Sequence, residues 1–423
     1  MDEHLEETMQ NTVDEVSRNI VELDRVEGDL EVKEHTTLKG KGTPAKITVS
    51  GTVYVEGDSV FECSLSAENM DGEDDINVEG DLEIANRVNI EDGRLKVSGN
   101  MSARQVNVDR SVEVRKNFEV DEVDIGGSLK VDGTTKARKI YVGGAFRARS
   151  AVNAERIEVG GSVEVDANVE VEDIEVGGKV EIGGGKANRV DVGGSFISTK
   201  ALEFKKIDVG GAVTLTGENV GGDITVGGSC KVKGNLKFDE IDVGGVITIS
   251  GSADGTALDV GGKVKVYGDL TLAENLDVAG TVEIEKELSA RNIDVGGRLC
   301  ARKATAISKV AVRNSMETIE GVHATSVTIG RRGRVSGPIA ANDATIGRRA
   351  HVEDVHADTL TLERGAKAEN LYGKNIQIES GCQVYGEVQY TESLETEHDI
   401  RFAETPRKVD KLPLAPETTQ SLS

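Results

Sequence analysis

The chain has 423 residues and a formal net charge of −25, with 75 Asp and Glu against 50 Lys and Arg. A balance this acidic argues against general nucleic-acid binding and against contact with anionic membrane surfaces. Aromatic residues make up 3% of the chain and tryptophan is absent, so there are few stacking platforms for sugars or single-stranded nucleic acid.

The four cysteines lack the paired spacing of a zinc site or a disulfide framework: Cys63, Cys230, Cys300 and Cys382. This usage favours a reducing compartment, and we expect a cytoplasmic protein without a metal or another cofactor. Residues 1–30 lack the basic start and apolar run of a signal peptide. No run of 18 apolar residues predicts a transmembrane helix.

Residues 1–24 differ in pattern from the rest of the chain. Their apolar residues recur every three or four positions and predict a short amphipathic helix: Leu5, Met9, Val13, Val16 and Ile20. Residues 1–30 hold ten Asp or Glu against two Arg. Two roles fit: a docking or self-association helix, and a cap that hides the open strand edge of the first coil, which we favour. The acidic polar face gives little support to membrane contact.

Residues 25–107 predict β-strands with an irregular period. Short alternations of apolar and polar residues, typical of strands with one buried face, begin at Val26, Leu30 and Val32. Insertions near 33–46 and 56–75 interrupt the spacing. The sequence therefore predicts irregular β-solenoid coils here without fixing their register.

From residue 108 to residue 390 the sequence repeats with a period close to 17. Phrases such as Ile140-Tyr-Val-Gly-Gly recur, each with an aliphatic anchor residue before a glycine pair or its counterpart. The anchors lie 16 to 18 positions apart, at 108, 125, 142, 159, 176, 192, 209, 226, 243, 260, 278, 295, 312, 329, 346, 362 and 378. Apolar and polar residues alternate between them, and a further apolar position follows about every six residues. The repeat predicts an all-β, single-stranded β-helix (a β-solenoid) with 17-residue coils, three short sides per coil and a triangular cross-section.

The glycine pairs mark one corner of each coil. A sharp corner needs either a positive φ or a close approach of two backbones, and glycine permits both. After Val295 the glycine pairs fade, but the 17-residue rhythm continues.

Arginines recur at this corner late in the repeat. The phrase Ile-Gly-Arg-Arg occurs twice, one coil apart, and predicts a line of stacked arginines: Arg298, Arg331, Arg332, Arg348 and Arg349. Stacked like charges repel, so one hypothesis is a lateral basic stripe that receives an acidic partner, such as the N-terminal segment of a neighbouring copy. The alternative is surface arginines paired with carboxylates such as Glu353 or Glu363. The nearby histidines share no repeat position, and we interpret them as surface residues: His323, His351 and His356.

After Tyr390 the repeat pattern ends. Residues 391–423 are polar and carry three of the five prolines, which predicts a disordered tail.

Coils of the form Val/Ile-x-Val-Gly-Gly-x-Val-x-Val, few aromatic residues and polar termini resemble the bactofilin family of polymer-forming cytoskeletal proteins. The resemblance covers about residues 108–378 and rests on motifs shared by β-solenoids generally. It implies a right-handed triangular β-helix that polymerises end to end, without nucleotide, into cytoplasmic filaments that scaffold cell shape or localise partners. The chain departs from the family in its many coils and in an acidic N-terminus, where members often carry an apolar membrane-targeting segment.

The open ends of a β-solenoid are the expected sites of polymerisation. A terminal coil exposes strand edges and apolar side chains, and a heterologous contact between two ends builds an open filament. The candidate polymer interface comprises residues of the first and last predicted coils: Val26, Leu30, Val32, Ile376, Ile378, Val384 and Val388. The main expected partner is the protein itself, with residues 1–24 or 391–423 as candidate contacts for other cytoskeletal or cell-envelope proteins.

Two other classes of protein were weighed. A non-polymerising scaffold that displays binding faces to partner proteins is the alternative that the sequence leaves open. An enzyme is disfavoured, because the regular coils allow few insertions from which to build a cleft, and no nucleophile elbow, phosphate loop or zinc spacing occurs. We expect no catalytic residues, and a carbohydrate-active β-helix enzyme is the least favoured interpretation.

Overall fold

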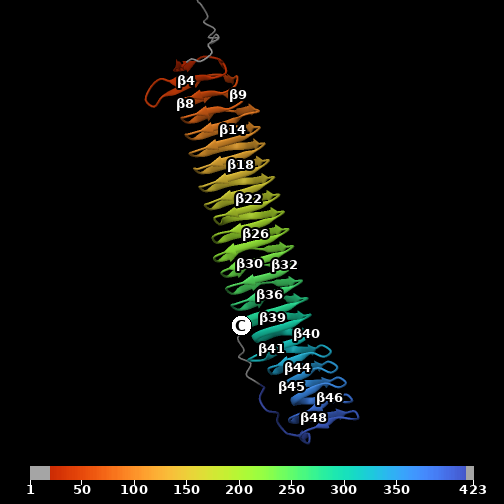
Figure 1. The fold of residues 1–423 in the computed structure, drawn as a ribbon. Coiled ribbons are helices and arrows are strands. Elements are labelled where there is room, and N and C mark those ends of the chain that lie inside the picture. Colours follow the sequence, from red (N-terminus) through yellow and green to blue (C-terminus); the bar gives the residue numbers. More distant parts are fainter. Residues whose placement is uncertain (1–19, 416–423) are drawn as a thin grey trace, which may run out of the picture. The chain divides into compact units, whose positions relative to one another are not determined.

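The computed structural model describes residues 20–415, and no helix occurs in that range. The chain divides into two compact units, residues 1–204 and 205–423. In each unit, short strands pair in parallel with the equivalent strands of the next coil, as Figure 1 shows. Each unit is therefore a parallel β-solenoid, which confirms the fold class predicted from the repeat.

One regular coil of the first unit illustrates the architecture. Strand β16 (Phe118–Ile125) bends where two successive residues, Asp121 and Glu122, both face away from the core. A shorter strand, β17 (Ser128–Val131), completes the coil. On either side of the bend and in β17, every second side chain is buried, because successive side chains of a strand point to opposite faces. Each coil thus contributes three short segments to three ladders.

The register between coils is 17 residues on all three segments. Strand β18 (Thr135–Val142) pairs with β16 through Val120 to Ala137 and Ile125 to Val142. Strand β19 (Ala145–Ala148) pairs with β17 in the same offset. The anchors from 108 to 192 form one ladder in the first unit. Those from 209 to 378 form one in the second. The predicted repeat is correct.

The first described coil consists of β1 (Ile20–Leu23), β2 (Arg25–Val26) and β3 (Leu30–Val32). These strands pair with β4 (Thr36–Gly40), β5 (Lys46–Val49) and β6 (Thr52–Val55) of the next coil. The predicted N-terminal helix is wrong at Ile20, which begins a strand. Its residues 1–19 lie outside the described part of the chain.

The solenoid also continues beyond its predicted end. Strand β48 (Val388–Thr396) is followed by β49 (Arg401–Phe402) and β50 (Arg407–Lys408), and all three pair with the preceding coil. The disordered tail was therefore placed too early, at 391. The error has a physical reason: this coil is mostly polar, as is usual for the capping coil of a repeat protein, so the apolar rhythm that marks the other coils is missing.

The glycine pairs permit close stacking of backbones. A Cβ built on Gly160 would lie 2.3 Å from the carbonyl oxygen of Gly143, and one on Gly161 would lie 2.4 Å from that of Gly144. None of these glycines has a positive φ. Of the two explanations that the sequence left open, close backbone approach is the one that applies.

A row of stacked aspartates in the second unit provides a test of this register. Asp242, Asp259, Asp277 and Asp294 are partners in adjacent coils. Partial burial raises the pKa of Asp259, and the charges of Asp277 and Asp242 raise it further. A carboxyl whose pKa is higher in the folded chain than in the unfolded one costs stability when charged, and that cost disappears as the pH falls through the folded-state pKa.

We therefore expect Asp259→Asn to stabilise the chain at neutral pH. Because the row is exposed and screened by solvent, the gain is about 0.5 kcal/mol. Thermal melting at low salt checks it, and the gain should vanish in acid. Asp124→Asn is the matched control, since Asp124 is flanked in its row by the uncharged Asn107 and Tyr141. An equal effect of both substitutions would contradict the stacked row.

Candidate functional site

The corner between two sides of the coil changes shape after Ile329. The N–H of Gly333 donates to the carbonyl of Gly330 at 2.9 Å, which closes a tight turn in which Arg332 has a φ of 61°. The same turn recurs in the next coil, where Arg349 has a φ of 59°. A left-handed conformation at a non-glycine residue costs roughly 1 kcal/mol, and the equivalent residue of the following coil is Gly365, with a φ of 73°.

These turns stack directly on one another. Strands β42 (Val322–Ile329), β44 (Ile339–Ile346), β45 (His351–Leu362) and β46 (Lys367–Ile378) flank them. The N–H of Arg332 donates to the carbonyl of Arg348 at 2.9 Å, and the N–H of Arg349 donates to that of Arg364 at 3.1 Å. The predicted stacking of the two Arg-Arg pairs is correct, and Arg364 extends it by one more coil.

Arg298 does not belong to this line, so its predicted place was wrong. It begins β40 (Arg298–Val312) and aligns with Ser315, which in turn aligns with Arg334 of β43 (Arg334–Ser336). Its guanidinium lies 2.5 Å from Glu317. The turn after Ile329 contains two residues more than the corner that precedes Ser315, and this shifts the register of all that follows.

We call the resulting exposed surface the arginine corner: Arg331, Arg332, Arg348, Arg349 and Arg364. A second basic row runs beside it on the adjoining side of the coil, and its members align from coil to coil: Arg334, His351 and Lys367. Sequence reasoning missed Arg334, Arg364 and Lys367, although each lies one coil-length from a residue of its own row and register alignment could have found them.

The nearest carboxylates are largely engaged by backbone N–H groups. Glu363 accepts the N–H of Arg348 at 3.1 Å, and its side chain lies 3.9 Å from the same residue's guanidinium. Glu379 accepts the N–H of Arg364 at 2.9 Å. Glu353 accepts the N–H of Gly337 and the hydroxyl of Ser336 instead of an arginine. Within residues 20–415, the only ion pair at the arginine corner is that between Arg348 and Glu363.

The candidate polymer interface has two very different ends in the structure. Val26, Leu30 and Val32 lie in the first described coil, where β2 and β3 each pair with only one strand of residues 20–415. The predicted C-terminal group, in contrast, is 0–1% exposed, since Leu394, Thr396 and Phe402 of the next coil align with Ile376, Ile378 and Val384. Val388 belongs to the strand that starts that coil. Its prediction as an exposed apolar end is wrong, because the polar capping coil covers it.

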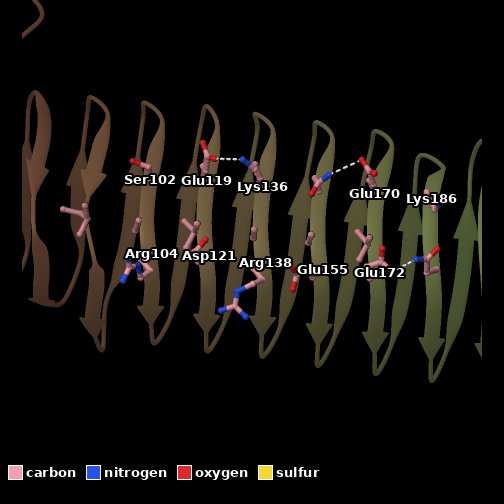
Figure 2. A pocket seen from close by; sticks show the side chains of 18 of the residues that line it. Ser102, Arg104, Glu119, Asp121, Lys136, Arg138, Glu155, Glu170, Glu172 and Lys186 are labelled. Carbon is pink, nitrogen blue, oxygen red and sulfur yellow. Dashed lines mark hydrogen bonds and ion pairs between the residues drawn. The ribbon is translucent and has the colours of Figure 1, made fainter.

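A shallow groove of about 760 Å³ runs along one side of the first unit. Figure 2 shows side chains from successive strands in two parallel rows. Within one row Lys136 lies 2.8 Å from Glu119, and Asn153 donates to Glu170 at 3.1 Å. The charge of Glu119 raises the pKa of Lys136. The charged groups thus neutralise one another from coil to coil, which makes the groove a ladder of ion pairs and hydrogen bonds.

Burial makes the thiols poor nucleophiles. It raises the pKa of the Cys230 thiol to about 12 and also raises the pKa values of Cys63, Cys300 and Cys382. Cys300 is the most accessible of the four. A thiolate forms readily only where the pKa is lowered.

His323 is buried, contrary to its interpretation as a surface residue. Burial lowers the pKa of its imidazole, the positive charge of Lys303 lowers it further, and the backbone of Glu320 acts in the opposite direction. Such a histidine favours the fold while neutral, so stability is full above the unfolded pKa of about 6.5 and falls as the pH drops below that value.

We therefore expect the chain to melt at a lower temperature at about pH 5 than at about pH 7.5, and His323→Gln to reduce this difference. The exposed His351 supplies the control substitution, His351→Gln, which should leave the acid sensitivity unchanged. Thermal melting of both variants at the two pH values checks the expectation. If His323→Gln melts with the full acid sensitivity of the wild type, buried His323 is not its source.

Two further findings bear on the kind of site. No helix among residues 20–415 is long and apolar enough to cross a membrane. In the same range, no group of three or more His, Cys, Asp or Glu side chains is arranged to hold a metal ion.

The fold places each unit among the parallel β-solenoids, a class of repeat protein. Comparisons with protein-family models, with curated proteins and with solved structures gave no match.

Proposed function

We propose that the chain is a structural scaffold whose coils present evenly spaced rows of side chains to partner proteins. The observation that carries this proposal is the regular stacking of exposed polar rows. In the first unit, for example, the guanidinium of Arg156 lies 2.9 Å from Asp173 and 2.7 Å from Glu175 of the next coil. A surface of this kind suits recognition by a rigid repeat protein, and the proposal assigns no catalysis to it.

A second candidate function is end-to-end assembly into nucleotide-independent cytoplasmic filaments, as the resemblance to bactofilins implies. The specific observation in its favour is that the described strands of both terminal coils have one neighbour each: β1 to β3 at one end, and β49, β50 and the last residues of β48 at the other. Parallel edges of opposite ends can pair heterologously, which builds filaments. In this proposal the three ladders form a right-handed, triangular coil.

Blocking one edge tests the filament. The carbonyl of Val32 accepts the N–H of Glu56 in the next coil. Backbone groups of successive strand residues point to opposite edges, so the N–H of Glu31 points to the outer edge. Glu31→Pro should therefore abolish the outer donor and spare the fold, since proline is tolerated on edge strands.

The measurement is sedimentation of the purified chain with negative-stain imaging. Wild-type filaments that disappear in Glu31→Pro and persist in the control Glu31→Ala would support assembly through this edge. A wild-type chain that stays monomeric at all concentrations would leave the scaffold function and remove the filament.

A further inference from the structure

The arginine corner is a concentrated basic surface on a strongly acidic chain. Elsewhere in residues 20–415, guanidinium groups commonly meet carboxylates of the adjacent coil, as Arg147 meets Glu164 at 2.6 Å and Arg302 meets Glu320 at 2.6 Å. At the arginine corner the single ion pair is long, at 3.9 Å, and joins side chains that are 67% and 37% exposed. The local positive charge is therefore largely uncompensated by the described part of the chain.

The arrangement of this charge is costly to the fold. Arginines are stacked at the coil spacing of about 4.8 Å, where like charges repel. Arg332 and Arg349 also hold the left-handed conformation that Gly365 and Gly381 adopt in the next two coils. Glycine would avoid both costs, so the two arginines are better explained by something that they bind than by the stability of the turn.

The chain itself supplies a ligand of complementary charge. Residues 1–19 hold six Asp or Glu against one Arg. Every copy of the chain brings this segment together with an arginine corner, at equal concentration. A nucleic acid fits less well, since the net charge of −25 would repel it from the rest of the surface.

We propose that the arginine corner binds the acidic N-terminal segment, residues 1–19, of a second copy of this chain. The contact is lateral and is made by side chains, so it does not depend on the strand edges of the terminal coils. End-to-end assembly and this docking surface can therefore fail separately. Binding by charge also makes the contact weaken as salt is added.

A charge swap between two full-length variants tests the proposal. The corner variant carries Arg331→Glu, Arg332→Glu, Arg348→Glu and Arg349→Glu. The segment variant carries Glu3→Lys, Glu6→Lys, Glu7→Lys and Asp14→Lys. In sedimentation velocity at low salt, each variant alone should self-associate about tenfold more weakly than the wild type, and an equimolar mixture should recover association, because each reversed surface then meets its complement.

Two controls separate docking from damage to the fold. Arg332→Gly with Arg349→Gly relieves the left-handed strain, so this double variant should melt no lower than the wild type and still associate several-fold more weakly. Reversal of four exposed basic residues of the first unit should leave association unchanged: Arg104, Arg110, Arg115 and Lys116.

Several results would overturn the proposal. One is a mixture of the two swapped variants that stays dissociated. Another is unchanged association of the corner variant alone, which also covers the case of a chain whose own segment occupies its corner. A third is a wild-type corner that captures a short DNA duplex or an anionic vesicle while the segment variant still self-associates, which would assign the surface to a different partner.

Discussion

Replacing Gly160 with alanine is expected to lower the melting temperature by on the order of 10 °C, equivalent to about 3 kcal/mol for a unit of this size. The new Cβ would lie 2.3 Å from the carbonyl oxygen of Gly143. That oxygen belongs to the backbone of the preceding coil, and the N–H of Gly160 itself bonds to Val142, so neither coil can move aside without weakening the ladder. Thermal melting followed by circular dichroism measures the loss.

Ser162→Ala is the matched control for this prediction. Ser162 follows the same glycine pair, and its side chain is exposed, so its removal should shift melting by no more than about 1 °C. A melting temperature of Gly160→Ala within that margin would mean that the coils are not stacked as closely as the structure has them.

A chain truncated after Tyr390 is expected to self-associate at concentrations about tenfold lower than the full chain does, and to bind an apolar fluorescent dye. The truncation removes β49, β50 and most of β48, whose residues cover Ile376, Ile378 and Val384. An uncovered core of this kind drives association through apolar burial. Light scattering and dye fluorescence measure the effect.

The control for the truncation is a chain that ends after Ala415, which keeps the capping coil and should behave as the full chain does. Equal solubility of both truncated chains would show that residues 391–408 do not cover the core. The same pair of variants bears on the filament, since filaments formed only by the shorter chain would identify the capping coil as a barrier to end-to-end assembly.

The repeat itself could be predicted from the sequence because the anchors carry both signals that matter. A residue such as Val142 is β-branched and precedes a glycine pair, and the same phrase returns 17 positions later at Val159. Each anchor aligns with the next in the ladder. Spacing alone could not reveal why the glycines are needed, since positive φ and close stacking select the same residue.

The irregular first coils resisted prediction because their ladders are interleaved. Val78 and Ile90 are only 12 residues apart, and they belong to different ladders: Val78 aligns with Phe61 and Val97, and Ile90 aligns with Gly72 and Val108. A glycine at an anchor position removes the aliphatic signal on which the register was based.

The candidate site was predicted in part. The stacking of the two Arg-Arg pairs follows from their identical context, but the extra residues of the turn displaced Arg298 from the line. The burial of His323 left no trace in the sequence, because its position in the repeat is otherwise an outward one: the equivalent residues of neighbouring coils are Thr305 and Ala340. Only the packing around the side chain decides its exposure.

The register of stacked coils can be measured directly by the rate of disulfide formation between engineered cysteines, in a chain whose native cysteines have been replaced. Ser162 and Lys179 are partners in adjacent coils, and the coil spacing of about 4.8 Å lies within the Cα separation that a disulfide spans. The account predicts rapid oxidation of Ser162→Cys with Lys179→Cys and none of Ser162→Cys with Glu170→Cys, which lies on another side of the coil. Equal rates for the two pairs, or a faster second pair, would contradict the stacked 17-residue coil.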